Sequence, residues 1–180
     1  MAGVIPPIRP GKHPADPERS PYKVSMSDIV SRFCTTGERS AILQGLLELR
    51  AGLHSIGVIK GFQWIDGSFL ENIEYTESRP PNDVDVVTYA FLPNGHTQST
   101  FMPDLHPYMD RQQVKDNYRI DHYVRILPEI DIHDICYWYS LWSHRRDGLW
   151  KGFAEVDLDP KDDAQAKSVL EAKIGAGFNV

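Results

Sequence analysis

Cysteine, long apolar runs and excess positive charge are all scarce in this chain of 180 residues. Cys34 and Cys136 are too few and too far apart for a disulfide framework or a zinc motif, so we expect both to be buried apolar residues in a reducing compartment. No stretch of about 18 apolar residues occurs, and no charged N-terminal region leads into an apolar one. We therefore expect no signal peptide, no membrane span and a cytoplasmic location. The net charge of −6 argues against a large surface that grips nucleic acid.

The composition is that of an ordinary globular protein, with 41% hydrophobic and 24% charged residues, and the length suits one domain. Prolines are concentrated at the start of the chain, at Pro6, Pro7, Pro10, Pro14, Pro17 and Pro21. They predict an extended arm over residues 1–23, packed along the body through Val4, Ile5 and Ile8. Residues 24–180 would then form a single domain.

The spacing of apolar residues predicts helices alternating with strands. Ser27 is the expected cap of a short helix that ends at Phe33, and Thr35 with Glu38 fits a capping box. Further helices are predicted at 37–55, 108–117, 129–143 and 160–173, and strands at 58–65, 83–91, 118–127 and 152–158. This pattern predicts an α+β (mixed α/β) fold, with a mixed sheet of three to five strands and helices mainly on one face.

Two carboxylates occur at alternate positions of the second predicted strand. Asp83 and Asp85 would point to the same face, about 7 Å apart along the strand. Two ionised carboxylates on a buried strand repel each other, which favours a divalent metal ion between them. The alternative is a turn at residues 81–83 and a solvated Asp85, which a lone Asp-x-Asp motif would favour.

A third carboxylate and a Gly-Ser turn favour the metal site. Asp121 lies on the next predicted strand and would be about 5 Å away if the two strands are neighbours. Carboxylates on rigid strands suit Mg²⁺ or Mn²⁺. Asp131 and Asp134 are alternatives to Asp121. Gly67-Ser68 would let the backbone approach a triphosphate closely.

This set of residues resembles the DNA polymerase β-type nucleotidyltransferase superfamily. The matching motifs are Asp66-Gly67-Ser68-Phe69, Asp83-Val84-Asp85-Val86 and the later Asp121. The Ile5-Pro6-Pro7 start and the segment 142–152 are similar to small bacterial nucleotidyltransferase-like proteins.

The resemblance implies transfer of a nucleoside monophosphate from an NTP, ATP most of all, to an acceptor hydroxyl with release of pyrophosphate. Asp83 and Asp85 would hold two metal ions, and Asp121 would hold the one that activates the nucleophile. Gly67 and Ser68 would hold the β- and γ-phosphates.

Four basic residues are candidates for binding phosphate oxygens: Arg79, Arg145, Arg146 and Lys151. For the last three, the alternative is a solvated helix end. Arg111 and Lys115 are interpreted as a solvated helix face. The loop residues Glu71, Glu74 and Glu77 are interpreted as a source of solubility.

Aromatic residues recur at helical spacing at Tyr137, Trp138 and Trp142, which favours core packing over a base-stacking platform. For His133 and its aspartate neighbours, the polar first turn of that helix is favoured over a metal site. His122 would alternate to the face opposite Asp121, as a packing or surface residue.

The sequence does not identify the acceptor, which in the superfamily is a protein, an oligonucleotide or a small molecule. A homo-oligomer or a partner protein could complete the site. The resemblance also suggests bacterial antiviral defence or a toxin–antitoxin pair. The alternatives are a non-catalytic nucleotide- or partner-binding module and a metal-dependent phosphohydrolase.

Overall fold

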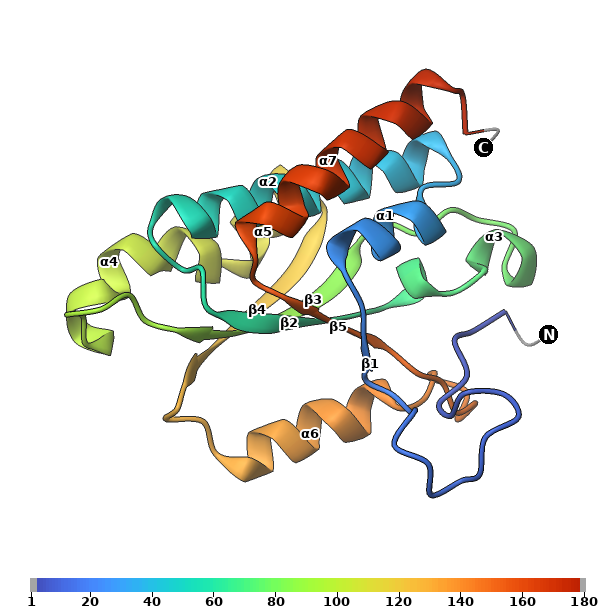
Figure 1. The fold of residues 1–180 in the computed structure, drawn as a ribbon, viewed down its shortest axis with the longest axis horizontal. Helices are drawn as coiled ribbons and strands as arrows, with labels where there is room; N and C mark the ends of the chain where they lie inside the picture. The colour runs from blue at the N-terminus through green and yellow to red at the C-terminus, as the bar shows by residue number, and fades with distance from the viewer. Residues whose placement is uncertain (1–2, 179–180) are drawn as a thin grey trace.

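The computed structural model describes residues 3–178 as a five-stranded mixed sheet with α-helices on both faces (Figure 1). In chain order the elements are β1 (Tyr22–Lys23), α1 (Met26–Phe33), α2 (Gly37–Ser55), β2 (Gly61–Asp66), the 3₁₀ helix η1 (Ser68–Leu70), α3 (Ile73–Thr76), β3 (Val84–Phe91), α4 (Gln98–Met109), α5 (Arg111–Tyr118), β4 (Ile120–Leu127), α6 (Ile132–Trp142), β5 (Ala154–Asp157) and α7 (Pro160–Gly175). The predicted class, a mixed α/β fold, is confirmed. No helix in the described range is both long and apolar enough to cross a membrane.

The strand order is β1-β5-β2-β3-β4. The central pairs β2–β3 and β2–β5 are antiparallel, whereas β3–β4 and β1–β5 are parallel. The register places Asp66 opposite Asp85 and Asp85 opposite Asp121. Because cross-strand neighbours point to the same face of a sheet, these three side chains share one face.

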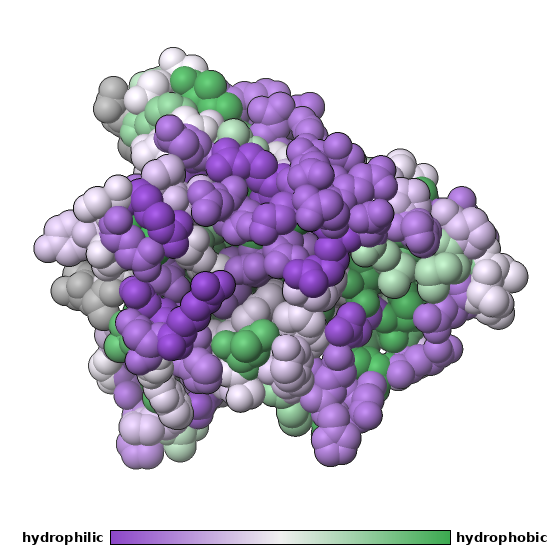
Figure 2. Space-filling model, turned by 180° about the vertical axis from the view of Figure 1, so that it is seen from behind, coloured by the Kyte–Doolittle hydropathy of each residue, from purple (hydrophilic) through white to green (hydrophobic). Residues whose placement is uncertain are grey.

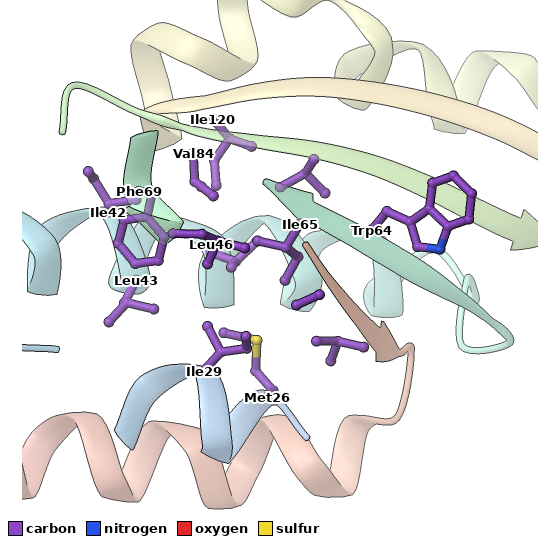
Figure 3. Close-up of a cluster of buried hydrophobic side chains, with 14 of the residues drawn as sticks. Met26, Ile29, Ile42, Leu43, Leu46, Trp64, Ile65, Phe69, Val84 and Ile120 are labelled. Atoms are coloured by element: carbon purple, nitrogen blue, oxygen red, sulfur yellow. The ribbon is translucent and has the colours of Figure 1, made fainter. Parts of the chain in front are cut away.

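Most helices cover one face of the sheet, and α6 covers part of the other (Figure 1). Figure 3 shows the core on the crowded side, where Ile42, Leu43 and Leu46 of α2 meet α1 and the sheet. On the α6 side, aromatic rings join α6 to the strands. The ring centroids of Trp138 and Tyr123 are 4.5 Å apart. Trp138 and Trp142 are buried, which confirms core packing for them, whereas Tyr137 is 58% exposed.

The first two helices begin at residues other than the predicted caps. Ser25 caps α1 in a capping box with Asp28, whereas the hydroxyl of Ser27 donates to Asp162 of α7. Thr36, not Thr35, caps α2. The predicted bounds of α2, residues 37–55, are confirmed.

The single helix predicted at 108–117 is wrong, because two helices meet there. Asp110 ends α4 and caps α5. Helix α4 contains Pro103 and Pro107, which usually break helices. A capping box at Thr97 and buried apolar side chains on one face stabilise α4 despite the prolines.

The N-terminal arm is looped rather than extended. The backbone N–H of Arg9 donates to the carbonyl of Glu18, and that of Gly152 donates to Ile5. The arm ends in the sheet, since Tyr22–Lys23 pairs with β5. Ile5 packs against the core, as expected. Cys34 is buried, as expected, but the same expectation is wrong for Cys136, which is exposed.

A chain of buried polar groups lies on the face of the sheet opposite α6. Arg50, which is fully buried, donates to Asp163 at 2.8 Å and to Gln63 at 2.7 Å. The side-chain amide of Gln63 donates a hydrogen bond to the hydroxyl of Thr88, and this hydroxyl lies 2.7 Å from Nε2 of His122. Burial lowers the pKa of His122 to about 4, so its ring is neutral. His122 is therefore a packing residue, one of the two roles expected for it.

We expect Arg50→Ala to lower the free energy of unfolding by about 3–5 kcal/mol, because it leaves Asp163, whose side chain is only 12% exposed, without its arginine partner. Urea unfolding measures the change. Arg32→Ala on the exposed side of α1 is the matched control, with a change below about 0.5 kcal/mol. Equal effects of the two variants would show that the buried pair contributes nothing specific.

Candidate functional site

Four carboxylates meet at one end of β2, β3 and β4, and we call them the carboxylate cluster: Asp66, Asp83, Asp85 and Asp121. The register aligns three of them across neighbouring strands, and Asp83 immediately precedes β3. Neighbouring strands lie about 5 Å apart, so the carboxylates interact directly. The structure thus brings the predicted Asp83, Asp85 and Asp121 together and adds a fourth member.

The alternatives to Asp121 have other roles. The side chain of Asp131 caps α6 by accepting from the backbone N–H of His133 at 3.0 Å. Asp134 accepts from Arg125 at 2.8 Å. Asp131 and His133 therefore belong to the polar first turn of α6, which was the favoured interpretation of these residues.

Asp85 is the central and least compensated member of the carboxylate cluster. Burial, and then the negative charges of Asp83 and Asp121, raise its pKa to about 6. Asp83 and Asp121 each have a cation of their own within hydrogen-bonding distance. Within residues 3–178, no lysine or arginine forms an ion pair with Asp85. Asp85 is therefore the carboxylate at which an added cation would gain most.

Helix α5 supplies the cations of Asp83 and Asp121. Nζ of Lys115 lies 2.5 Å from Oδ2 of Asp83. The guanidinium of Arg111 donates to both carboxylate oxygens of Asp121, at 2.8 and 2.9 Å. Arg111 and Lys115 are on a solvent-exposed face, as expected, but their pairing with Asp121 and Asp83 was not predicted. Their four-residue spacing, just before the strand that carries Asp121, was the available signal.

Gly67 brings the backbone against the carboxylate cluster. Its φ of +89° lies in the left-handed region, and a Cβ added there would be 2.3 Å from Oδ2 of Asp85. Ser68 follows as the first residue of η1 and is half-buried. Because η1 is only three residues long, it contributes little helix dipole. The polar groups available at this turn are the backbone amides and the hydroxyl of Ser68.

The basic residue Lys151 is a buried counter-ion. It comes from the segment before β5, and its Nζ lies 2.8 Å from Oδ1 of Asp66 and 3.2 Å from Oε1 of Glu71. Burial raises the pKa of Asp66 to about 7, and the charge of Lys151 opposes this shift. The membership of Asp66 in the cluster was not predicted. The interpretation of Glu71 as a source of solubility is wrong, because Glu71 is buried and paired with Lys151.

The other basic candidates lie at the rim. Arg145 is within 3.4 Å of Glu71 and 3.6 Å of Glu77. Arg79 pairs with Glu77 at 2.9 Å, and Arg146 is exposed on the loop after α6. Arg145 and Arg79 therefore pair with glutamates rather than with the carboxylate cluster.

The cluster has oxygen donors of the kind that Mg²⁺ and Mn²⁺ prefer. As placed, the side chains of residues 3–178 include no group of three or more His, Cys, Asp or Glu residues arranged around a metal position. Lys115 and Arg111 pair with oxygens of Asp83 and Asp121, so a divalent ion could use these donors only if the two contacts opened.

The chain belongs to a family of unknown function, DUF6932, whose profile matches residues 1–157. The matched region includes the carboxylate cluster, α5 and Lys151. Neither the curated proteins nor the solved structures gave a match.

We expect Asp85→Asn to stabilise the protein at pH 8 by about 1–3 kcal/mol and to change little near pH 4. The folded-state pKa of Asp85 is raised, so its stabilising contribution is complete below pH 4 and is lost as the pH rises through about 6. Thermal unfolding of both proteins between pH 4 and pH 8 measures the difference. A difference that is constant with pH would contradict the raised pKa.

Gly67→Ala should cost more stability than Gly95→Ala, by at least about 1 kcal/mol. Both glycines have nearly the same φ, +89° and +87°, but an added Cβ meets Asp85 only at Gly67 and meets nothing within 4 Å at Gly95. The difference in unfolding free energy between the variants therefore isolates the close approach to Asp85. Equal losses would show that backbone strain alone accounts for both.

Proposed function

We propose that the protein is a metal-dependent nucleotidyltransferase of the DNA polymerase β type, which transfers a nucleoside monophosphate from an NTP to an acceptor hydroxyl. The observation that carries this proposal is the alignment of Asp85 with Asp121 on parallel neighbouring strands, with Asp83 two residues earlier. The nucleotidyltransferase fold is part of the proposal. The mixed sheet and the Gly67 turn that abuts Asp85 support it.

Asp83, Asp85 and Asp121 would hold Mg²⁺ or Mn²⁺. When bound, such an ion neutralises phosphate charge and polarises the reacting oxygens. The raised pKa of Asp85 supports this assignment, because it results from burial of the carboxyl and then from the negative charges of Asp83 and Asp121.

The chain's own groups would orient the reactants. The amides at Gly67 and the hydroxyl of Ser68 would bind the β- and γ-phosphates of the NTP, and Arg146 and Arg79 could reach them from the rim loops. In the transfer, the acceptor oxygen bonds to the α-phosphorus while the bond from this phosphorus to the bridging oxygen breaks. Pyrophosphate leaves, and the carboxylate of Asp121 takes the proton of the acceptor hydroxyl.

The acceptor belongs to the proposal only as a class: a hydroxyl of a protein, an oligonucleotide or a small molecule. Bacterial antiviral defence or a toxin–antitoxin pair is the proposed setting. A homo-oligomer or a partner protein could supply the surface that clamps the acceptor.

A second candidate function is a nucleotide- or partner-binding module without catalysis. The closed ion pairs at Asp83 and Asp121 favour it, because they leave fewer free oxygens for a metal ion. A protein of this kind would bind an NTP without turning it over.

Incubation of the purified protein with each α-³²P-labelled NTP and Mg²⁺ or Mn²⁺ tests the proposal. We expect a labelled product or released pyrophosphate, reduced at least about 100-fold in Asp83→Asn/Asp85→Asn. Asp104→Asn, an exposed aspartate on α4, is the control and should retain full activity.

Labelling that persists in the double variant would overturn the proposal. Nucleotide binding without turnover, in the presence of candidate acceptors from a cell extract, would establish the non-catalytic module instead.

A further inference from the structure

Two kinds of cation contact the carboxylate cluster, and they differ in exposure. The side chain of Lys151 is 6% exposed and lies between two buried carboxylates. The side chains of Arg111 and Lys115 are 54% and 46% exposed, whereas their partners Asp121 and Asp83 are each 20% exposed. Lys151 is therefore a fixed counter-ion, and the α5 cations cover the cluster from the solvent side.

The α5 cations can leave once a divalent ion takes their place. Water solvates the released, half-exposed cations, and the metal ion compensates the partly buried carboxylates of Asp121 and Asp83. Helix α5 lies at the back of the molecule in the view of Figure 1, and that back is predominantly hydrophilic (Figure 2). Lys151 cannot leave in this way, because its departure would leave the buried carboxylates of Asp66 and Glu71 without their cation.

The same cations are in position to meet an incoming polyphosphate. The guanidinium of Arg111 lies over the ring of Tyr123, with 4.3 Å between its central carbon and the ring centroid. This contact keeps Arg111 beside the cluster when its bonds to Asp121 open. An arginine and a lysine one helical turn apart can bind phosphate oxygens together, the arginine through two parallel hydrogen bonds.

Charge balance links the pairing of Arg111 and Lys115 with carboxylates to their binding of phosphates. Three carboxylates, Asp83, Asp85 and Asp121, face two α5 cations, so a divalent ion added without rearrangement would lie beside two positive charges. Opposite charges a few ångströms apart attract strongly at a partly buried site, and like charges repel equally strongly. Release of Arg111 and Lys115 toward the phosphates removes the repulsion and gains new attraction.

We propose that Arg111 and Lys115 are exchangeable counter-ions that give up Asp121 and Asp83 to a divalent cation and then bind the phosphates of the NTP. This inference rests on the proposed function. It adds two substrate-binding residues to the site and makes metal and nucleotide binding depend on each other.

Binding measurements without turnover test the exchange. Mn²⁺ affinity, measured by electron paramagnetic resonance, should rise at least about threefold in Arg111→Gln/Lys115→Gln. Affinity for an ATP analogue with a methylene bridge between its α- and β-phosphorus, measured with saturating Mn²⁺, should fall at least about tenfold. A purely structural role would move both affinities in the same direction or neither.

Arg32→Gln/Lys167→Gln, which removes two exposed cations from α1 and α7, is the matched control for net charge. Circular dichroism and thermal unfolding check that every variant is folded.

The outcomes separate this inference from the proposed function. If the wild type binds Mn²⁺ through Asp83 and Asp85 but the α5 variant changes neither affinity, the exchange is wrong and the metal site stands. If the α5 variant binds Mn²⁺ where the wild type does not, the exchange is supported. If neither protein binds Mn²⁺, both the exchange and the proposed function fail.

Discussion

Mutual repulsion among four carboxylates at one end of β2, β3 and β4 is the constraint around which this part of the molecule is organised. Each surrounding segment contributes a cation or a close backbone contact to the cluster. The segment before β5 provides Lys151 for Asp66, and α5 provides Lys115 and Arg111 for Asp83 and Asp121. The turn at Gly67 brings backbone against Asp85, which has the least compensation.

A protein selected for stability alone would not retain such a cluster, because replacing a buried carboxylate with an amide removes the repulsion at no cost in volume. Compensation is also incomplete at the central position and is reversible at its neighbours, since Arg111 and Lys115 are half-exposed. This combination suits a site that exchanges one set of cations for another. The distant buried chain from Asp163 through Arg50 to His122 differs, because each of its groups has a fixed partner.

Sequence patterns predicted those parts of the fold and site that depend on local spacing. Helix α2 and the two strands that carry Asp85 and Asp121 follow from apolar periodicity and residue type, whereas the parallel pairing of these strands did not. The ion pairs did not follow, because Lys151 and Asp66 are 85 residues apart and nothing local to either indicates the other. Helix α4 was missed since tertiary packing of Phe101 and Leu105 outweighs two prolines.

A crystal structure with Mn²⁺ and the methylene-bridged ATP analogue, with Mn²⁺ located by anomalous scattering, tests the central claim most directly. The account predicts anomalous density among Asp83, Asp85 and Asp121, phosphates at the Gly67 turn, and Arg111 and Lys115 turned from the carboxylates to the phosphates. Mn²⁺ or the nucleotide bound at another part of the molecule, with Arg111 still paired to Asp121, would contradict it.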